Sequence, residues 1–418
     1  MARVMPFRAW RYDTERVADL ADVLAPPYDV ISPEQQALLY EREPHNIIRV
    51  ELAKAEPAEG EERYSHAAEL LQRWIESGYL LRDEDPAFYF HRHFFTVDDR
   101  VRARTGVFAA VGLEDYRNKI VLPHEATLSK PKADRLSLLR ATRMNISPIF
   151  GIVPDADAGM RAVLCNMHQG ELVAVASGPE RHELWRVTGE KARQLTELLA
   201  SRQIVIADGH HRYETSLSYR DEVRQRLGAV PTDVGSEYTL MYLCSSVDRG
   251  LRILAAHRLL KLDSTPTEAE LWELAGKRFE VTQHPRLADG HTCLDLLGES
   301  EIGFACYLAG NWYLLTLREP LPPGKLHVEA LHEMLIDPLL GGSEQRENRL
   351  GFIVSHAEAI DRIDSGEFQV GFFLKPVRIE ELEARSRSGG VMPQKSTYFY
   401  PKVPTGLVLK SAEAGESL

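Results

Sequence analysis

Cysteine is scarce in this 418-residue sequence, and long hydrophobic runs are lacking. Because the four cysteines have no C-x-x-C spacing, they argue against a structural zinc site and against a disulfide scaffold. No stretch reaches the roughly 18 apolar residues that cross a bilayer, and residues 1–10 lack the apolar core of a signal peptide. We therefore expect a soluble, cytoplasmic protein with reduced thiols at Cys165, Cys244, Cys293 and Cys306.

Positive charge is also in deficit. The formal net charge is −12, and the acidic excess is spread along the chain. This balance argues against a nonspecific DNA-binding protein and against a protein that binds anionic membranes. The length, with 44% hydrophobic and 27% charged residues, suffices for two or three hydrophobic cores. Any nucleotide site must therefore be basic locally, and the oligomeric state stays open.

Lysine is rare in particular, with 12 lysines against 38 arginines. An ammonium group acts as a compact point charge on phosphate, which is a physical reason to keep lysine rather than arginine at a phosphate site. Four of the 12 lysines fall in the segments that carry the motifs below, at Lys130, Lys132, Lys395 and Lys402.

The most informative stretch is an apolar run that breaks at an Asp-Gly pair and resumes as a polar, basic helix start: Asp208, Gly209, His210, His211, Arg212. Gly209 has no Cβ, so backbone amides can approach an anion there. The first turn of the following helix offers N–H groups and its positive dipole end, and Arg212 can grip phosphate oxygens in a fork. The pattern predicts a phosphate cradle. From these residues alone, an ordinary strand-to-helix turn with solvated side chains remains open.

Three motifs carry a resemblance to known proteins. The string from Asp208 to Arg212 resembles the G-x-x-R phosphate-binding turn of the ParB/sulfiredoxin superfamily, in the form found in its free-serine kinases. Pro123-His124-Glu125 resembles the P-H-E segment that carries the catalytic glutamate of those kinases. Pro393-Gln394-Lys395-Ser396-Thr397 resembles their P-K-[ST]-T segment beside the nucleotide.

Over nearly its full length the sequence is similar to the bacterial and archaeal DUF1015 family. The segments that carry this similarity are 25–30, 46–50, 123–135, 145–150, the Asp208 turn and 395–402. The family name implies no activity, so the functional expectation depends on the kinase-like motifs.

The resemblance implies a role for each motif in phosphoryl transfer, which needs charge neutralisation, in-line placement and a carboxylate that accepts the hydroxyl proton. Glu125, with His124 beside it, would be catalytic. The nucleotide would contact Asp208, Gly209, His210, His211, Arg212, Lys395, Ser396 and Thr397. Asp208 would also help to hold Mg²⁺, which favours carboxylate and phosphate oxygens. The alternative is a turn-forming aspartate that caps the next helix.

We therefore expect a small-molecule kinase that transfers a phosphoryl group from ATP or ADP to the hydroxyl of free L-serine or a similar metabolite. The alternative is a nucleotide-binding regulatory switch of the ParB-like kind, which would need the turn but not Glu125. A sulfiredoxin-like activity is disfavoured, because His210 stands where a catalytic cysteine would be needed. Tyr398-Phe399-Tyr400 replaces the basic residue that follows the lysine segment in the kinases, so the acceptor can differ.

The expected fold class is α+β, with a ParB/sulfiredoxin-like nucleotide-binding core, a large N-terminal extension and inserted α/β modules. Glu125 and Asp208 are 83 residues apart, farther than in the compact serine kinases, which predicts an insertion between them. The expected segments are an N-terminal α+β region at 1–118, a catalytic core at 119–250, a second α/β module at 251–375 and a C-terminal segment at 376–410 that returns to the active site.

Local patterns predict several elements of the N-terminal half. Ser32 before Pro33 is typical of a helix start. The periodicity predicts a helix over 33–41, a strand over 46–52, an amphipathic helix over 61–77, and a hairpin of strands 88–97 and 102–113.

Two histidines of that hairpin, His91 and His93, are two residues apart and so share one face of a strand. This spacing suits a pair of metal ligands. No third ligand is evident nearby in the sequence, so packing is the favoured interpretation.

Overall fold

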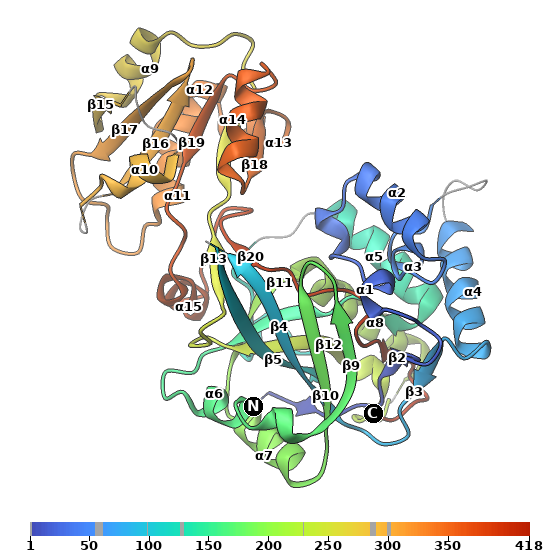
Figure 1. The fold of residues 1–418 in the computed structure, drawn as a ribbon. Helices are drawn as coiled ribbons and strands as arrows, with labels where there is room; N and C mark the ends of the chain where they lie inside the picture. The colour runs from blue at the N-terminus through green and yellow to red at the C-terminus, as the bar shows by residue number, and fades with distance from the viewer. Residues whose placement is uncertain are drawn as a thin grey trace. The chain divides into compact units, whose positions relative to one another are not determined.

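The structure is a computed structural model that describes residues 2–54, 62–97, 99–125, 129–228, 230–284, 290–298 and 302–418, without the side chains of 129–131, 291 and 347. The chain forms two compact units, coloured along the sequence in Figure 1. The first unit comprises Met1–Arg252 and Pro401–Leu418, and the second comprises Ile253–Tyr400. The C-terminal residues therefore complete the fold of the first unit.

A nine-stranded mixed sheet forms the framework of the first unit. In spatial order its strands are β6 (Val121–Leu122), β11 (Ile204–Asp208), β8 (Ile149–Val153), β12 (Tyr238–Ser245), β5 (Arg100–Gly112), β4 (Phe88–Val97), β10 (Arg181–Val187) and β9 (Glu171–Ser177), with β1 (Val4–Met5) paired to β5 off this path. The β6–β11 and β8–β12 pairs are parallel, and the other pairs are antiparallel. Because β6 and β11 run in the same direction, the loops that follow them leave the sheet at the same edge.

Two further strand pairs and the helices surround this sheet. The pairs are β2 (Trp10–Tyr12) with β3 (Leu80–Arg82) and β7 (Met144–Asn145) with β21 (Lys410–Ser411). The helices are α1 (Leu20–Val23), α2 (Pro33–Arg42), α3 (Ile48–Glu51), α4 (Glu62–Glu76), α5 (Ser129–Thr142), α6 (Gly159–Leu164), α7 (Gly189–Ala200) and α8 (His210–Leu227). Helix α5 packs between α4 and α8.

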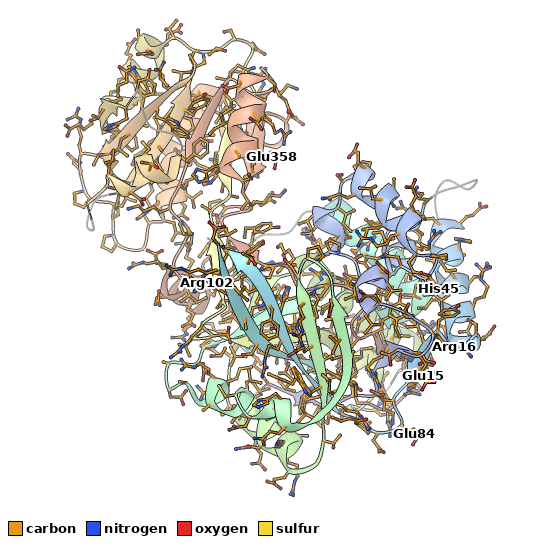
Figure 2. The ribbon with its side chains drawn as sticks, in the orientation of Figure 1. Glu15, Arg16, His45, Glu84, Arg102 and Glu358 are labelled. Atoms are coloured by element: carbon orange, nitrogen blue, oxygen red, sulfur yellow. The ribbon has the colours of Figure 1, made fainter. Side chains whose placement is uncertain are left out.

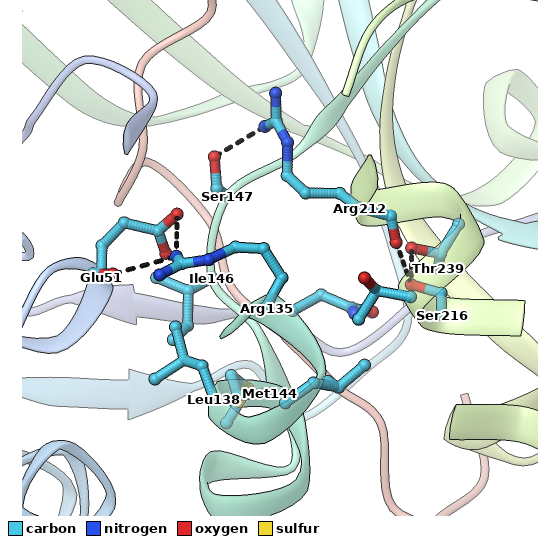
Figure 3. Close-up of a pocket in the computed structure, with 12 residues that line it drawn as sticks. Glu51, Arg135, Leu138, Met144, Ile146, Ser147, Arg212, Ser216 and Thr239 are labelled. Atoms are coloured by element: carbon cyan, nitrogen blue, oxygen red, sulfur yellow. Dashed lines mark hydrogen bonds and ion pairs between the residues drawn. The ribbon is translucent and has the colours of Figure 1, made fainter. Parts of the chain in front are cut away.

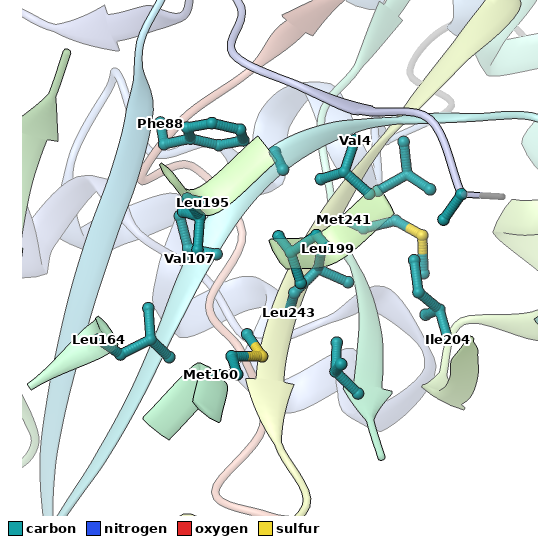
Figure 4. Packing of buried hydrophobic residues seen from close by; sticks show 14 of the residues in the cluster. Val4, Phe88, Val107, Met160, Leu164, Leu195, Leu199, Ile204, Met241 and Leu243 are labelled. Carbon is teal, nitrogen blue, oxygen red and sulfur yellow. The ribbon is translucent and has the colours of Figure 1, made fainter. Parts of the chain in front are cut away.

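The main hydrophobic core of the first unit lies where α6 and α7 cover one face of the sheet (Figure 4). Side chains that alternate along the strands point into this core, as the two-residue period of a strand requires. The residues labelled in Figure 4 are fully or almost fully buried: Val4, Phe88, Val107, Met160, Leu164, Leu195, Leu199, Ile204, Met241 and Leu243. Charged side chains such as Glu15 and Glu84 lie exposed on the surface instead (Figure 2).

The second unit has a six-stranded antiparallel sheet of its own. Its strand order is β15 (Phe279–Gln283), β17 (Asn311–Leu317), β16 (Gly303–Leu308), β19 (Val370–Phe373), β14 (His257–Leu260) and β18 (Leu350–Ile353). Strands β13 (Arg252–Leu254) and β20 (Tyr398–Tyr400) pair where the chain enters and leaves this unit. The helices are α9 (Glu268–Ala275), α10 (Gly290–Asp295), α11 (His327–Leu331), α12 (Asp337–Leu340), α13 (Arg346–Arg349), α14 (His356–Asp364) and α15 (Ile379–Arg387).

Several elements lie where the local patterns predict them. The helix expected over 61–77 is α4, and the hairpin expected over 88–113 is formed by β4 and β5. Ser32 caps α2 as predicted: its side chain accepts from the backbone N–H of Gln35 at 3.2 Å, and the Gln35 side chain accepts in turn from the Ser32 N–H. Among the described residues no helix is both long and apolar enough to cross a membrane.

The strand predicted over 46–52 is wrong, because residues 48–51 form the helical turn α3. The β-branched residues of this segment favour a strand by propensity, but the buried Asn46 decides otherwise. Its side chain accepts from the backbone N–H of Ile48 at 2.9 Å, as a capping residue does, and donates to the carbonyls of Asp22 at 2.6 Å and Leu24 at 3.0 Å. Local side-chain bonds of this kind compete with sheet formation.

Replacing Asn46 with alanine is expected to lower the free energy of unfolding by about 2 to 4 kcal/mol, because the buried carbonyl of Leu24, the part-buried carbonyl of Asp22 and the buried N–H of Ile48 lose a partner. Urea denaturation measures the change. Asn118→Ala is the matched control, since its side chain bonds Glu114 at the surface, and it should change stability by less than about 0.5 kcal/mol. Equal effects of both substitutions would contradict the role given to Asn46.

The structure divides the chain differently from the four segments expected in sequence. Segments 1–118 and 119–250 contribute strands to one continuous sheet, so they are parts of a single unit. The insertion expected between Glu125 and Asp208 contains β8, β9 and β10, which are strands of that same sheet. The second unit runs from Ile253 to Tyr400 and so includes most of the segment 376–410.

Candidate functional site

The P-H-E segment and the Asp208 turn lie side by side at one edge of the large sheet. Strand β6 pairs with β11 in parallel, with Val121 opposite Ile204 and Leu122 opposite Val205. Each motif directly follows its strand. The backbone N–H of His124 lies 3.3 Å from Nε2 of His210, and the two rings meet edge to face with centroids 4.6 Å apart. Two motifs that are distant in sequence are therefore in contact.

The turn itself has the geometry of a strand-to-helix anion site. Gly209 adopts a φ of +92°, in the left-handed region, and α8 begins at the next residue. A Cβ placed on Gly209 would lie 2.9 Å from Nε and 3.0 Å from Cζ of Arg212. A side chain at this position would therefore fill the space between the turn and the guanidinium group.

Arg212 is buried and holds the turn together. Its Nη1 donates to Oγ of Ser147 at 2.7 Å and to the carbonyl of Pro148, and its Nη2 lies 2.5 Å from Oδ2 of Asp208. Figure 3 shows the bond to Ser147. Its Nε is buried and has no hydrogen-bond partner within the described part of the chain. Arg212 is thus a positioning residue. Its Nε–H, next to Gly209, is a donor without a partner among the described residues.

Asp208 accepts from two cations. Arg212 engages its Oδ2, and the ammonium of Lys402 engages its Oδ1. Burial alone would raise the pKa of Asp208, but the charges of Lys402 and Arg212 hold that pKa well below its usual range. The donor set does not fit Mg²⁺, because both carboxylate oxygens are taken and two positive charges stand beside them. Arg212 and Lys402 therefore occupy the carboxylate that the sequence predicted as a Mg²⁺ ligand.

Two other segments similar to DUF1015 contribute residues close to Arg212. Ser147 belongs to segment 145–150, and Arg135 belongs to segment 123–135. The guanidinium of Arg135 lies 4.3 Å from the ring centroid of Tyr28 and forms a buried ion pair with Glu51 at 3.2 Å. Burial raises the pKa of Tyr28 to about 12, against the opposing charge of Arg212. Glu51, Arg135 and Ser147 thus lie near Arg212.

Two hollows adjoin this group of residues. A small cavity of about 40 Å³ lies behind Arg212, and Figure 3 shows its lining, which includes Ser216 and Thr239. A larger hollow of about 530 Å³ opens beyond it between α2, α4 and α5. Both are lined by Glu51, Arg135 and Leu138. The hollows therefore adjoin each other at the Glu51–Arg135 pair.

Both histidines of the contact between the motifs are neutral imidazoles. Burial lowers the pKa of His124 to about 4, although its bond to the carbonyl of Ile206 opposes the shift. Burial and the neighbouring His124 ring lower the pKa of His210 well below its usual value. The half-buried His211 also has a lowered pKa, with burial as the main cause.

Stability should fall as the pH drops from about 6.5 to about 4. An unfolded histidine takes up a proton near pH 6.5, whereas buried His124 does so only near pH 4. The unfolded state then binds more protons, and each such histidine lowers stability by up to about 1.4 kcal/mol per pH unit. Urea denaturation from pH 7.5 to 4.5 measures the slope. His124→Gln should reduce the slope, and the exposed control His168→Gln should leave it unchanged. A flat profile in the parent would contradict the burial of neutral histidines.

Glu125 and Lys132 follow β6 in the sequence. Glu125 directly follows His124 and is half-buried. Lys132, on α5, forms an ion pair of 2.8 Å with Glu214 of α8. The side chain of Lys130 lies outside the described residues. The α5–α8 contact thus brings a second lysine of the motif segments to the helix that starts at the turn.

The predicted residues Lys395, Ser396 and Thr397 belong to the second unit. Lys395 adopts a φ of +54°, its carbonyl accepts from Arg258 at 3.1 Å, and its ammonium lies 5.5 Å from the ring centroid of Phe352. The hydroxyl of Ser396 donates to the carbonyl of Pro393 at 2.6 Å. Their contact with a nucleotide at the turn remains a prediction.

Sequence reasoning missed Lys402 as a site residue, although the scarcity of lysine drew attention to it. Its contact with Asp208 joins positions 194 residues apart, which no local pattern reveals. Ser147, Glu51 and Tyr28 were also missed, although they lie in or next to segments that carry the family resemblance.

Comparisons with solved structures give distant similarities. A conserved hypothetical protein from Pyrococcus furiosus is 16% identical, with a TM-score of 0.37, over 74% of this chain and 97% of that one. A free serine kinase in complex with AMP is 17% identical, with a TM-score of 0.36, over 72% and 92%. SbnI from Staphylococcus aureus, with a C-terminal truncation, is 11% identical, with a TM-score of 0.34, over 73% and 88%. At these values the superpositions assign no substrate.

Comparisons of sequence give one family. No protein of curated function shows significant similarity to the chain. Residues 4–340 match the family described as a protein of unknown function, DUF1015. Because this match covers well over half of the sequence, the chain belongs to the DUF1015 family.

Proposed function

We propose that this protein binds the phosphate chain of ATP or ADP at the Gly209 turn and transfers a phosphoryl group to the hydroxyl of free L-serine or a similar small metabolite. One observation carries the proposal: the P-H-E segment touches a glycine turn that holds a buried arginine, whose Nε–H has no partner among the described residues. A carboxylate motif and an anion cradle thus adjoin each other.

The cradle is suited to phosphate by its backbone. Helix α8 starts directly after Gly209, so the N–H groups of its first turn and its positive dipole end face the turn. The Nε–H of Arg212, which none of the residues in the described ranges accepts, adds a charged donor beside the glycine. Anions bind at helix starts of this kind through backbone amides, and a missing Cβ lets them come close.

Glu125 is the proposed general base. Its carboxylate accepts the proton of the acceptor hydroxyl while that oxygen forms a bond to the terminal phosphorus. The bond between this phosphorus and the bridging oxygen breaks, and the shortened nucleotide leaves with the bonding electrons. Glu125 itself is half-buried. His124 acts as a positioning residue, since its neutral ring fixes the segment against the Ile206 carbonyl and His210.

Lys402 supplies positive charge next to the turn. Its ammonium is paired with Asp208, and a bound phosphate would share it. Protein kinases and related enzymes hold Mg²⁺ through substrate phosphates and one or two carboxylates. Because two cations already engage Asp208, the proposed mechanism does not use Asp208 as a Mg²⁺ ligand. Lys395, Ser396 and Thr397 are proposed as a second wall of the nucleotide site.

The competing function is a nucleotide-binding switch without catalysis. Such a protein needs the cradle but no carboxylate motif beside it. The contact between His124 and His210 brings the P-H-E segment to the cradle, and this favours the enzyme.

The direct test incubates the purified full-length chain with ATP or ADP, Mg²⁺ and a panel of amino acids and hydroxy acids, and follows products by mass spectrometry. A phosphorylated acceptor, formed in step with loss of the nucleotide's terminal phosphate, is the expected result. Nucleotide binding without any phosphorylated product would favour the switch, and no binding at all would reject both functions.

A further inference from the structure

A group of buried histidines lies on the face of the large sheet opposite the α6–α7 core. Strands β4 and β10 pair in antiparallel register with His93 directly opposite His182. His91 is two residues before His93 and therefore shares its face. All three rings are buried, and the ring centroids of His93 and His182 are 4.1 Å apart.

A carboxylate completes the group. Glu180 directly precedes β10, and its Oε2 is 2.6 Å from Nε2 of His93. One ligand atom from each of His93, Glu180 and His182 lies within 4.8 Å of the other two. The side chain of Glu180 is 34% exposed, so the group is reached from solvent at this end. Sequence reasoning found no third ligand because His93 and Glu180 are 87 residues apart.

His91 is hydrogen-bonded to His182. Its Nε2 is 3.1 Å from Nδ1 of His182, so Nε2 of His182 remains as the nitrogen able to bind a metal. Nδ1 of His91 is buried without a hydrogen-bond partner in the part of the chain that the structure describes. Metal-binding histidines commonly have their second nitrogen fixed by a hydrogen bond in this way. The contact fixes the ring orientation of His182.

We propose that His93, Glu180 and His182 form a binding site for a divalent transition metal, with Zn²⁺ as the best-matched ion and His91 as the residue that orients His182. Two imidazoles and one carboxylate are a ligand set that Zn²⁺ favours, and they leave a fourth position for water or a small ligand. The site is distinct from the proposed nucleotide site and does not depend on it.

We expect the positive charge of Arg104, which lies next to His93, to weaken the binding of a metal ion. Its Nη2 is 3.4 Å from Nδ1 of His93. Without metal, Nδ1 accepts from Arg104 and Nε2–H donates to Glu180. When Nε2 binds the metal, the proton sits on Nδ1 and faces the guanidinium. Arg104 is held by the carbonyl of Pro401 at 2.6 Å and by the ring of Phe150, so it stays in place.

Calorimetric titration of the full chain with Zn²⁺, after removal of bound metal with a chelator, tests the site. The parent should bind one Zn²⁺ per chain and unfold at a higher temperature with the ion than without it. Glu180→Gln should weaken binding by at least about tenfold, the lower end of the loss seen for residues that merely support ligands. Circular dichroism checks that the variant is folded.

Glu171→Gln on β9 is the matched control, because Glu171 belongs to the same hairpin but is exposed and pairs with Arg186. It should bind Zn²⁺ like the parent. If the parent binds no Zn²⁺, or if Glu180→Gln and the parent bind it equally, the proposed site is excluded. His182→Asn gives a second independent variant with the same expected loss.

Discussion

Replacing Glu125 with glutamine is expected to lower turnover by about 10²- to 10⁴-fold while nucleotide affinity stays near that of the parent. Glutamine keeps the shape of the side chain but cannot accept a proton, and general base catalysis contributes factors of this size. A loss in kcat without a loss in binding marks an interaction made only in the transition state. Product formation followed by mass spectrometry gives the rate, and calorimetry gives the affinity.

Glu222→Gln is the control for this substitution. Glu222 lies on α8, at the surface, and pairs with Arg140 at 2.5 Å, away from the turn. Its replacement should leave turnover within about twofold of the parent, as is usual for surface positions. Parent-like turnover of Glu125→Gln would make Glu125 a structural residue and would leave the switch as the better function.

Replacing Arg212 with alanine should affect both stability and binding. Asp208, Ser147 and Pro148 lose a buried partner at once. Removing one side of a buried ion pair typically costs about 3 to 5 kcal/mol, although Lys402 remains to compensate part of the charge on Asp208. Nucleotide binding should weaken by a further 1 to 3 kcal/mol, roughly the size of a charged hydrogen bond. Urea denaturation and calorimetry measure the two effects separately.

Arg226→Ala provides the comparison, because Arg226 is exposed in the last turn of the same helix. It should change stability by less than about 0.5 kcal/mol and leave nucleotide affinity unchanged. Arg212→Lys separates charge from geometry, since lysine keeps the charge but not the fork, and it should recover only part of the loss. Full stability of Arg212→Ala would contradict its role as the residue that holds the turn.

The sequence correctly predicted elements whose structure depends mainly on residues within one short segment. The break at Asp208-Gly209 predicted a strand, a turn and a helix, and β11, the positive φ of Gly209 and α8 follow in that order. The α4 helix and the β4–β5 hairpin were also predicted, because hydrophobic periodicity is a local property.

The sequence did not predict structure that depends on contacts between residues distant in the chain. Residues 46–52 appear strand-like in isolation, but the carbonyls of Asp22 and Leu24 bind the Asn46 side chain and favour a helical turn. Similarly, the pairing of Asp208 with Lys402 and the approach of Glu180 to His93 depend on sheet order and on the course of the C-terminal segment. Neither can be read from spacing in one sequence.

Hydrogen exchange of the full chain with and without saturating ADP or ATP tests most directly whether the Gly209 turn holds a nucleotide. Bound phosphates would satisfy the N–H groups at the start of α8, so exchange should slow in the segment 209–213. Slower exchange in 394–398 as well would support Lys395 as a second wall, whereas protection confined to the turn would remove that loop from the site. Unchanged exchange at 209–213 in the presence of saturating nucleotide would contradict the account.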